Sequence, residues 1–175
     1  MTIILETERL ILKTSTRENF LQVYQLLSDP DVMRYIGNGP KAENEVREGL
    51  EKMIKHQERH GFAFGDIYLK NSGEYIGRAG LIYLAMNDDQ DEIEVGYQLH
   101  KKYWGQGYAT EITKALINWG FEHLQLEQIV AVIQTENQLS QRVLEKSGLN
   151  YAGKSTYYGR ELSKFQIKKV DAIIG

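Results

Sequence analysis

The sequence predicts a mixed α/β fold in which a largely antiparallel sheet is flanked by helices. Two apolar runs on either side of Asn71–Gly73, followed by an alternating run at 92–99, are typical of an antiparallel meander. Helical and strand patterns then alternate from Gly107 to the C-terminus. With 175 residues, 42% of them hydrophobic and 26% charged, the chain fits one domain spanning residues 1–175.

The N-terminal part is predicted to hold a short strand and two helices. Its elements, in order, are a strand at 9–13, a helix at 16–28, a helical turn at 30–36 and a long helix at 42–60. Ser15 and Glu18 match a capping box at the start of the first helix. The buried stripe of the long helix consists of Val46, Leu50, Met53 and Ile54.

The rest of the chain is predicted to alternate between strands and helices. Its elements are strands at 62–70, 75–84 and 92–99, a helix at 107–123, a strand at 128–134, a helix at 137–148, and strands at 151–156 and 165–170. Gly148 is placed to end the second of these helices. The nearly all-apolar run at 128–134 suits a central strand.

The composition narrows the classes of partner. A net charge of −3 and the lack of any basic run argue against nucleic acid and favour a neutral or cationic partner. The chain contains no cysteine, and therefore no disulfide and no thiolate metal site. Glu6, Glu8 and Arg9 interrupt the N-terminal apolar run before it reaches signal-peptide length, and no segment approaches a membrane span. We expect a cytoplasmic protein.

A glycine-rich stretch, LHKKYWGQGYATE at residues 99–111, directly follows a predicted strand and leads into a predicted helix. Such a turn directs several backbone N–H groups and the positive end of the helix dipole at one place. Gly105 and Gly107 have no Cβ, so an anionic group can approach the main chain closely. The spacing alone fits a phosphate site and a tight turn without a ligand equally well.

Three kinds of phosphate site place glycines in this way. A nucleotide P-loop needs Lys followed by Ser or Thr after the second glycine, and this chain has neither. A dinucleotide fold needs a third glycine where Thr110 stands, and a βαβ unit where a meander is predicted. A pyrophosphate held by the main chain alone, as in coenzyme A, remains compatible.

The same stretch resembles the acyl-CoA loop of the GNAT superfamily of N-acyltransferases, whose usual pattern is Q/R-x-x-G-x-G/A. Trp104, Gly107 and Ala109 occupy its first, fourth and sixth positions. The branch of ribosomal-protein N-terminal acetyltransferases usually carries WGxGYATE, and this chain matches every letter. The resemblance covers nearly the whole chain through further motifs in the family's order: ETERLIL, DPDVMRYI, EVGYQL and NQLSQRVLEKSGL.

The resemblance implies a twisted, splayed sheet with helices on both faces, and acetyl-CoA as co-substrate without a metal. The backbone of Leu99 would pair with the pantetheine arm, the loop amides would hold the pyrophosphate, and Asn137 would lie where two strands splay apart. The residues implied in cofactor binding are Leu99, Trp104, Gly105, Gln106, Gly107, Tyr108, Ala109, Thr110 and Asn137.

Ser140 and Glu94 are the candidate catalytic residues. Many family members carry a tyrosine as general acid seven residues after the asparagine, where this chain has Leu144. Ser140, one helical turn from Asn137, would then protonate the leaving sulfur. A serine at this place often bonds local backbone instead. Water also suffices to protonate a thiolate whose thiol has a pKa of about 8.5. Glu94 would be the base if burial raises its pKa; Glu92 on the same strand face is the alternative, and both also fit a solvated face.

The function implied is acetyl transfer to a primary amine by direct attack in a ternary complex. A protein N-terminal α-amine is the preferred acceptor, because it becomes neutral more easily than a lysine or polyamine amine. Polyamines and aminoglycoside-like amines stay open, as do a non-catalytic module that senses coenzyme A and a nucleotide-binding protein. The segments 36–41 and 150–164 are expected to shape the acceptor pocket, and the oligomeric state, monomer or homodimer, is open.

Two further features carry weaker signals. The acidic residues Asp88, Asp89 and Asp91 are placed to attract a cationic acceptor, although such loops are usually only solvated. His56 and His60 lie four residues apart on the long helix, but no HExxH glutamate or third ligand accompanies them, so we expect a surface pair and no metal.

Overall fold

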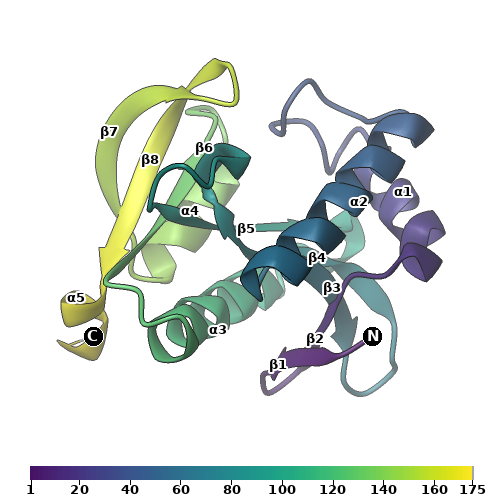
Figure 1. The fold of residues 1–175 in the computed structure, drawn as a ribbon, viewed down its shortest axis with the longest axis horizontal. Helices are drawn as coiled ribbons and strands as arrows, with labels where there is room; N and C mark the ends of the chain where they lie inside the picture. Colours follow the sequence, from purple (N-terminus) through teal and green to yellow (C-terminus); the bar gives the residue numbers. More distant parts are fainter. Residues whose placement is uncertain (175) are drawn as a thin grey trace.

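Eight strands of the computed structural model, which describes residues 1–174, form one sheet in the order β1-β2-β3-β4-β5-β6-β8-β7 (Figure 1). Their bounds are β1 Ile3–Glu6, β2 Leu10–Thr14, β3 Phe64–Leu69, β4 Tyr75–Tyr83, β5 Ile93–Leu99, β6 Gln128–Ile133, β7 Asn150–Tyr157 and β8 Arg160–Lys168. All neighbours are antiparallel except β5 and β6, which run parallel. The predicted mixed, largely antiparallel sheet is therefore confirmed.

The sheet splays open between β5 and β6. These strands pair at a single position, Glu94 opposite Val130, although each strand continues well beyond it. The backbone groups of Leu99 and Tyr97 turn toward this open edge, because His100 donates its N–H to Ile76 of β4 and successive residues alternate between the two edges of a strand. The splay thus leaves backbone of β5 without a neighbouring strand.

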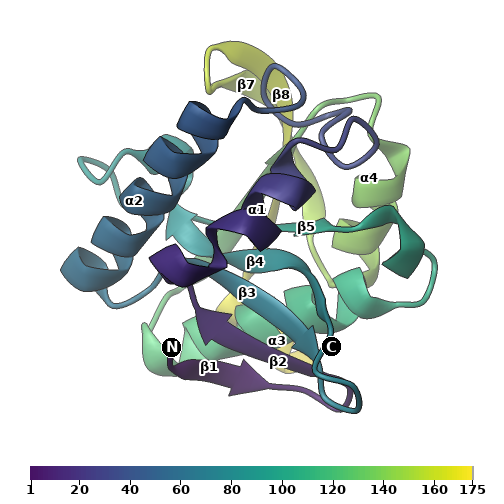
Figure 2. The ribbon, with the colours of Figure 1, turned by 90° about the vertical axis from the view of Figure 1, so that its right-hand side faces the viewer.

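Helices cover both faces of the sheet. The bounds are α1 Phe20–Leu27, α2 Glu43–His60, α3 Tyr108–His123, α4 Gln138–Lys146 and α5 Lys169–Ile174, with short 3₁₀ turns η1 Arg17–Asn19, η2 Leu84–Met86 and η3 Lys101–Tyr103. The two views place α1 and α2 together on one face and α3 and α4 on the other (Figures 1 and 2). No helix in the described part of the chain is long and apolar enough to cross a bilayer.

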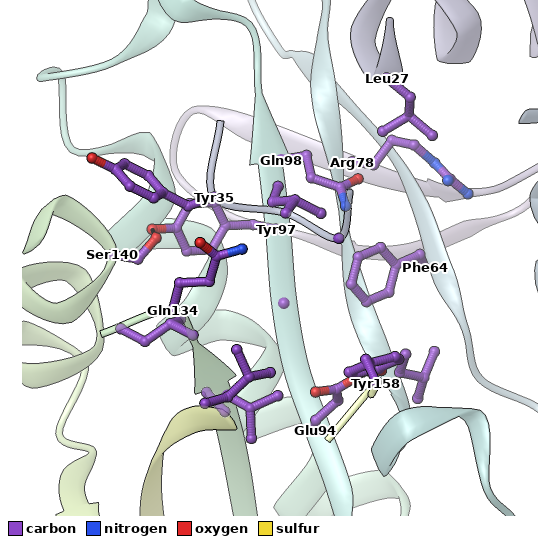
Figure 3. Close-up of a pocket in the computed structure, with 18 of the residues that line it drawn as sticks. Leu27, Tyr35, Phe64, Arg78, Glu94, Tyr97, Gln98, Gln134, Ser140 and Tyr158 are labelled. Atoms are coloured by element: carbon purple, nitrogen blue, oxygen red, sulfur yellow. Dashed lines mark hydrogen bonds between the residues drawn. The ribbon is translucent and has the colours of Figure 1, made fainter. Parts of the chain in front are cut away.

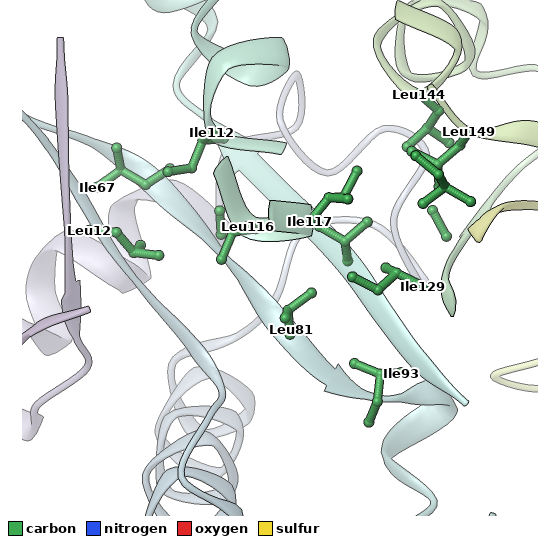
Figure 4. Packing of buried hydrophobic residues seen from close by; sticks show 14 of the residues in the cluster. Leu12, Ile67, Leu81, Ile93, Ile112, Leu116, Ile117, Ile129, Leu144 and Leu149 are labelled. Atoms are coloured by element: carbon green, nitrogen blue, oxygen red, sulfur yellow. The ribbon is translucent and has the colours of Figure 1, made fainter. Parts of the chain in front are cut away.

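The main core lies between the sheet and α3. Leu116 and Ile117 of α3 pack toward Leu81 of β4 and Ile93 of β5 (Figure 4). A smaller cluster, which includes Val23, Leu26, Met33 and Val46, joins α1 to α2. Each Å² of apolar surface buried here stabilises the fold by about 25 cal/mol. This packing keeps α3 against β4 and β5.

Most predicted elements form, and the differences are local. The meander, the helices α2, α3 and α4, and the central strand β6 are confirmed, and Gly148, with φ of +95°, follows the end of α4. The strand at 3–6 was not predicted. The segment 30–36, predicted as a helical turn, forms hydrogen-bonded turns, and Met33 donates its N–H to Asp29 in one helical-type bond. The last strand ends at Lys168 and continues as α5.

The predicted capping box at Ser15 is wrong. The Ser15 hydroxyl donates to the Phe64 carbonyl at 3.1 Å and accepts from the Arg78 guanidinium at 2.9 Å. The chain instead enters α1 through a 3₁₀ turn whose N-cap residue, Thr16, makes no side-chain capping bond. Hydrogen bonds to residues distant in sequence therefore engage the Ser15 hydroxyl in place of the helix cap.

The expected surface location of His56 is also wrong. His56 is 7% exposed, its Nδ1 lies 2.6 Å from the Phe62 carbonyl and its Nε2 accepts from the Tyr83 N–H. Burial lowers the pKa of this imidazole, and the two contacts fit the neutral tautomer with its proton on Nδ1. His56 joins α2 to β4 as a structural residue.

Candidate active site

The glycine loop connects β5 to α3 through two left-handed residues. Gly105 has φ of +73° and Gly107, the N-cap of α3, has φ of +83°. No backbone or side-chain acceptor among residues 1–174 receives the N–H groups from Gly105 to Thr110, as is usual at a helix start. These amides and the helix dipole form an exposed site that suits a diphosphate.

Arg9, in the connection between β1 and β2, holds this loop in place. Its guanidinium donates to the Gln106 carbonyl at 2.9 Å and to Glu111 at 2.8 Å, and lies 4.2 Å from the Tyr108 ring centroid. Thr7 donates to the same Glu111 carboxylate at 2.6 Å. Burial alone would raise the pKa of Glu111, but the bonds from Thr7 and Arg9 dominate and lower it, so an ionised carboxylate anchors the first turn of α3.

Trp104 connects the loop to the end of β5. Its indole N–H donates to the Leu99 carbonyl at 2.8 Å, while the side chain remains 38% exposed. The Leu99 carbonyl is thus engaged within the protein, and the Leu99 N–H and the backbone of Tyr97 remain at the open edge of β5. Trp104 therefore ties the loop to the last residue of β5 through this hydrogen bond.

A cavity of about 370 Å³ lies at the splay and extends toward α1 and α2. It is lined by β5 from Glu94 to Gln98 and by β6 and its following turn from Ala131 to Gln134, together with Asn137 and Ser140 of the next segment. The cavity thus passes between the two faces of the sheet at the only place where neighbouring strands of the described sheet separate. An extended arm and a second substrate can meet there.

Glu94 is the buried acid of this cavity. Its side chain is on β5 and the residue is 7% exposed. Burial raises the pKa of its carboxyl from 4.5 to about 7, and bonds from the Tyr158 hydroxyl and the Ala85 backbone only partly oppose this shift. A carboxyl with a pKa near neutrality is suited to take up a proton at physiological pH.

Tyr158 reaches Glu94 from a hairpin tip. Tyr158 and Gly159, with φ of +54° and +75°, form the two-residue turn between β7 and β8, and the Tyr158 hydroxyl donates to the Glu94 carboxylate. The neighbouring Arg160 donates to Asn38 at 2.9 Å, which joins this tip to the α1–α2 connection. The segments 36–41 and 150–164 therefore meet, as Figure 2 shows near the β7–β8 turn. Residues of both segments line the cavity.

Ser140 belongs to a hydroxyl network on the other side of β5. The Asn137 side chain caps α4 by accepting the Ser140 N–H at 3.2 Å, and its Nδ2 donates to the Ser140 hydroxyl at 3.0 Å. The Tyr97 hydroxyl also lies 3.0 Å from that oxygen. Because Ser140 accepts from Asn137, its own proton is free to be donated.

The two candidate catalytic residues occupy different parts of the cavity. Figure 3 shows Ser140 beside Tyr97, and Glu94 beside Tyr158 at a separate position along β5. Glu94 and Tyr97 also differ by an odd number of residues, so their side chains leave opposite faces of the strand. Glu94 faces the side of α1 and α2, whereas Tyr97 and Ser140 face the side of α3 and α4.

The sequence did not predict the contacts of two residues in this cavity, Tyr97 and Tyr158. Neither Tyr97 nor Tyr158 was identified as a site residue from the sequence alone. Their partners lie 43 and 64 residues away in the chain, so no local pattern indicates either contact. For Tyr97, the available signal is its place in the motif EVGYQL, three residues after Glu94.

Several expected contributors lie elsewhere. Glu92 pairs with Lys164 at 2.5 Å and does not line the cavity, and neither do Asp88, Asp89 and Asp91. Asp88 instead contacts Arg59 and His60 of α2, at 3.1 and 3.2 Å. Asp88 of the acidic loop therefore contacts the end of α2 instead of the cavity.

Known proteins resemble most of this chain in sequence. The family model described as Acetyltransferase (GNAT) domain matches residues 9–150. An uncharacterised N-acetyltransferase, YoaA of Bacillus subtilis (strain 168), is 33% identical over 158 residues, which are 86% of this chain and 84% of that protein. Spermidine N(1)-acetyltransferase of Escherichia coli (strain K12) is 28% identical over 144 residues, 81% of this chain and 73% of that protein.

Solved structures share the fold. An acetyltransferase from Agrobacterium tumefaciens str. C58 superposes with a TM-score of 0.82 at 24% identity, covering 94% of each chain. RimL, a ribosomal L7/L12 α-N-protein acetyltransferase solved in complex with coenzyme A, has a TM-score of 0.78 at 17% identity over 95% of this chain and 97% of that one. The family model, the relative at 33% identity and the splayed sheet lead to one conclusion: this chain belongs to the GNAT family and is an acetyltransferase.

Proposed function

We propose that the protein transfers the acetyl group of acetyl-CoA to a primary amine by direct attack in a ternary complex, and that the acceptor is an α-amine such as a protein N-terminus. The observation that carries this proposal is the cavity at the splay, which joins a coenzyme side at Ser140 and Tyr97 to an acceptor side at Glu94. An amine and a thioester entering from opposite faces meet at β5.

The backbone N–H groups on the coenzyme side fit the acceptor atoms of acetyl-CoA. The free amides from Gly105 to Thr110 suit the diphosphate, and the backbone of Tyr97, which has no neighbouring strand, suits an amide group of the pantetheine arm. In the proposed complex the Leu99 N–H donates to the thioester carbonyl, where negative charge develops during attack. Asn137 fixes Ser140 beside the arm.

The chemistry on the acceptor side falls to Glu94. The amine nitrogen forms a bond to the thioester carbonyl carbon and loses a proton, which Glu94 takes up directly or through one water. Its pKa of about 7 leaves a large fraction ionised at neutral pH, and the low polarity around it strengthens its basicity toward a bound ammonium group. The proton later passes to solvent.

The leaving group on the coenzyme side is a thiolate. When the carbon–sulfur bond breaks, Ser140 donates its proton to the sulfur, and the Tyr97 hydroxyl at 3.0 Å replaces that proton and is itself replenished from solvent. Leu144, at the position of the usual tyrosine, is 2% exposed in the core and supplies no proton. The Tyr97–Ser140 pair takes over its role.

The preference for an α-amine follows from proton affinities. An α-amine, with a pKa of about 7.7 to 8.0, matches a base near 7, whereas a lysine-type amine near 10.4 requires about 3.5 kcal/mol more to lose its proton. RimL, of the same fold, acts on a protein α-amine by its description. Both points favour an N-terminal acceptor.

The experiment is to measure free thiol released from acetyl-CoA by the protein in the presence of peptides with varied N-termini, polyamines and aminoglycosides. We expect thiol release that depends on the amine, with peptide α-amines among the substrates. If acetyl-CoA binds but no amine releases thiol, the protein is a coenzyme-sensing module. Stabilisation by ATP or NAD and not by acetyl-CoA would instead indicate a nucleotide-binding protein.

A further inference from the structure

The acceptor end of the cavity is mainly apolar. Its walls come from α1, α2, β3, β4 and β8, and the apolar side chains that form them include Leu27, Val46, Met53, Phe64, Ile82 and Leu162. Four of these six, namely Leu27, Val46, Ile82 and Leu162, are at most 7% exposed. A site of this kind gains affinity from an apolar group that displaces water.

Gly49 opens space in that wall. It lies in the middle of α2, on the same helix face as Val46 and Met53, and it lines the cavity. A Cβ built at Gly49 meets nothing within 4 Å. Glycine inside a helix costs about 1 kcal/mol relative to alanine, so room for a ligand is a physical reason for a glycine at this place.

The charges around the acceptor end do not suit a polycation. The acidic side chains among the lining residues are Glu45 and Glu94, and the basic ones are Lys41, Arg78 and Arg160. Glu45 already accepts the Ala42 N–H at 3.0 Å as a helix cap. A substrate with several ammonium groups needs several carboxylates facing it, and besides Glu94 this cavity offers only the helix-capping Glu45.

Arg78 does not alter that balance. Its guanidinium lies 3.4 Å from Asp66, which is fully buried, so this charge is compensated within the protein. Lys41 and Arg160 remain at the cavity, one from each of the two segments that meet over it. They repel any second cationic group of an acceptor whose first amine is at Glu94.

We infer that the acceptor is a monoamine with an apolar body, which occupies the space beside Gly49 with its amine at Glu94. A peptide whose first residue is apolar fits this description, and spermidine and aminoglycosides do not. The inference rests on the proposed function and specifies the substrate class of the same site. It makes Gly49 the residue that sets the size of the accepted side chain.

The test compares kcat/KM for 2-phenylethylamine and a Phe-initiated dipeptide amide with the values for spermidine and an aminoglycoside at one pH. The apolar monoamines are expected to exceed the polycations by about tenfold or more. Gly49→Leu should raise KM for the apolar monoamines by about tenfold, while the Kd for acetyl-CoA changes by less than about twofold. Glu48→Leu, which adds the same side chain to an exposed neighbouring position, is the matched control and should change neither.

A double variant tests the effect of the two basic residues at the cavity. Lys41→Glu combined with Arg160→Glu should improve kcat/KM for spermidine relative to 2-phenylethylamine by about tenfold or more. Amine-dependent thiol release with spermidine as the best substrate, or a Gly49→Leu variant with an unchanged KM, would overturn this inference and leave the transferase intact. Acetyl-CoA binding without thiol release from any amine would overturn the proposed function itself.

Discussion

Replacing Glu94 by glutamine should make the protein more stable at alkaline pH and much less active. Burial raises the pKa of this carboxyl from 4.5 to about 7. At about 1.4 kcal/mol per factor of ten, ionised Glu94 is about 3 kcal/mol less favourable in the folded chain than in the unfolded one. This destabilising burial of Glu94 occurs at the site where the proposed reaction needs a base.

The sign of the pH dependence follows from this raised pKa. Between pH 4.5 and about 7 the folded chain binds more protons than the unfolded chain, so its stability falls as the pH rises. The stabilising contribution of the protonated carboxyl is fully present below 4.5 and is lost as the pH passes about 7. Glutamine, which does not titrate, removes this loss.

The assay is urea unfolding of the wild type and Glu94→Gln at pH 5 and pH 8. The stability of the variant relative to the wild type should increase by about 2 to 3 kcal/mol between these pH values. Glu92→Gln, whose carboxylate pairs with Lys164 outside the cavity, is the matched control. If the relative stability of Glu94→Gln does not change with pH, burial does not raise the pKa of Glu94.

Activity is measured on the same proteins. For the wild type, kcat/KM should rise as the pH increases through about 7, because Glu94 must be ionised to accept a proton. Glu94→Gln should lose this inflection and at least about 100-fold in kcat. A variant with full kcat and an unchanged pH profile would remove Glu94 from the mechanism.

Other predictions concern the coenzyme side. Ser140→Ala and Tyr97→Phe should each lower kcat by about tenfold with little change in the Kd for acetyl-CoA, as steady-state assays and calorimetry can show; two fully active variants would exclude this pair as the proton source. Gly107→Ala places a Cβ at φ of +83° and 3.3 Å from the Arg9 guanidinium, so it should weaken acetyl-CoA binding and cost about 1 kcal/mol in a urea titration. Arg9→Ala, which frees the Gln106 carbonyl and Glu111, should also weaken acetyl-CoA binding; unaltered affinity would show that the loop needs no clamp.

Much of the fold is predictable because its signals are local. The alternation in EIEVGYQL, the turn at Asn71–Gly73 and the glycines of the loop each specify their own backbone, and the structure agrees with all three. Ser15 shows where this logic fails. Its spacing to Glu18 fits a cap, but Phe64 and Arg78, distant in sequence, engage its hydroxyl instead.

The candidate site is predictable only in part, for the same reason. The loop amides follow from Gly105 and Gly107, whereas the state of Glu94 depends on how deeply β5 is buried and on Tyr158 from a hairpin tip. The pairing of Tyr97 with Ser140 depends on the approach of α4 to β5. These contacts arise from tertiary packing, and no periodicity in the sequence encodes them.

The most direct test of the central claim is the backbone amide spectrum of residues 105–110 during titration with acetyl-CoA. Saturable shifts of the Gly105 to Thr110 amide signals are expected, together with a rise in melting temperature, because these N–H groups acquire phosphate acceptors. If the amide signals and the melting temperature stay unchanged at saturating acetyl-CoA, this loop does not bind the coenzyme.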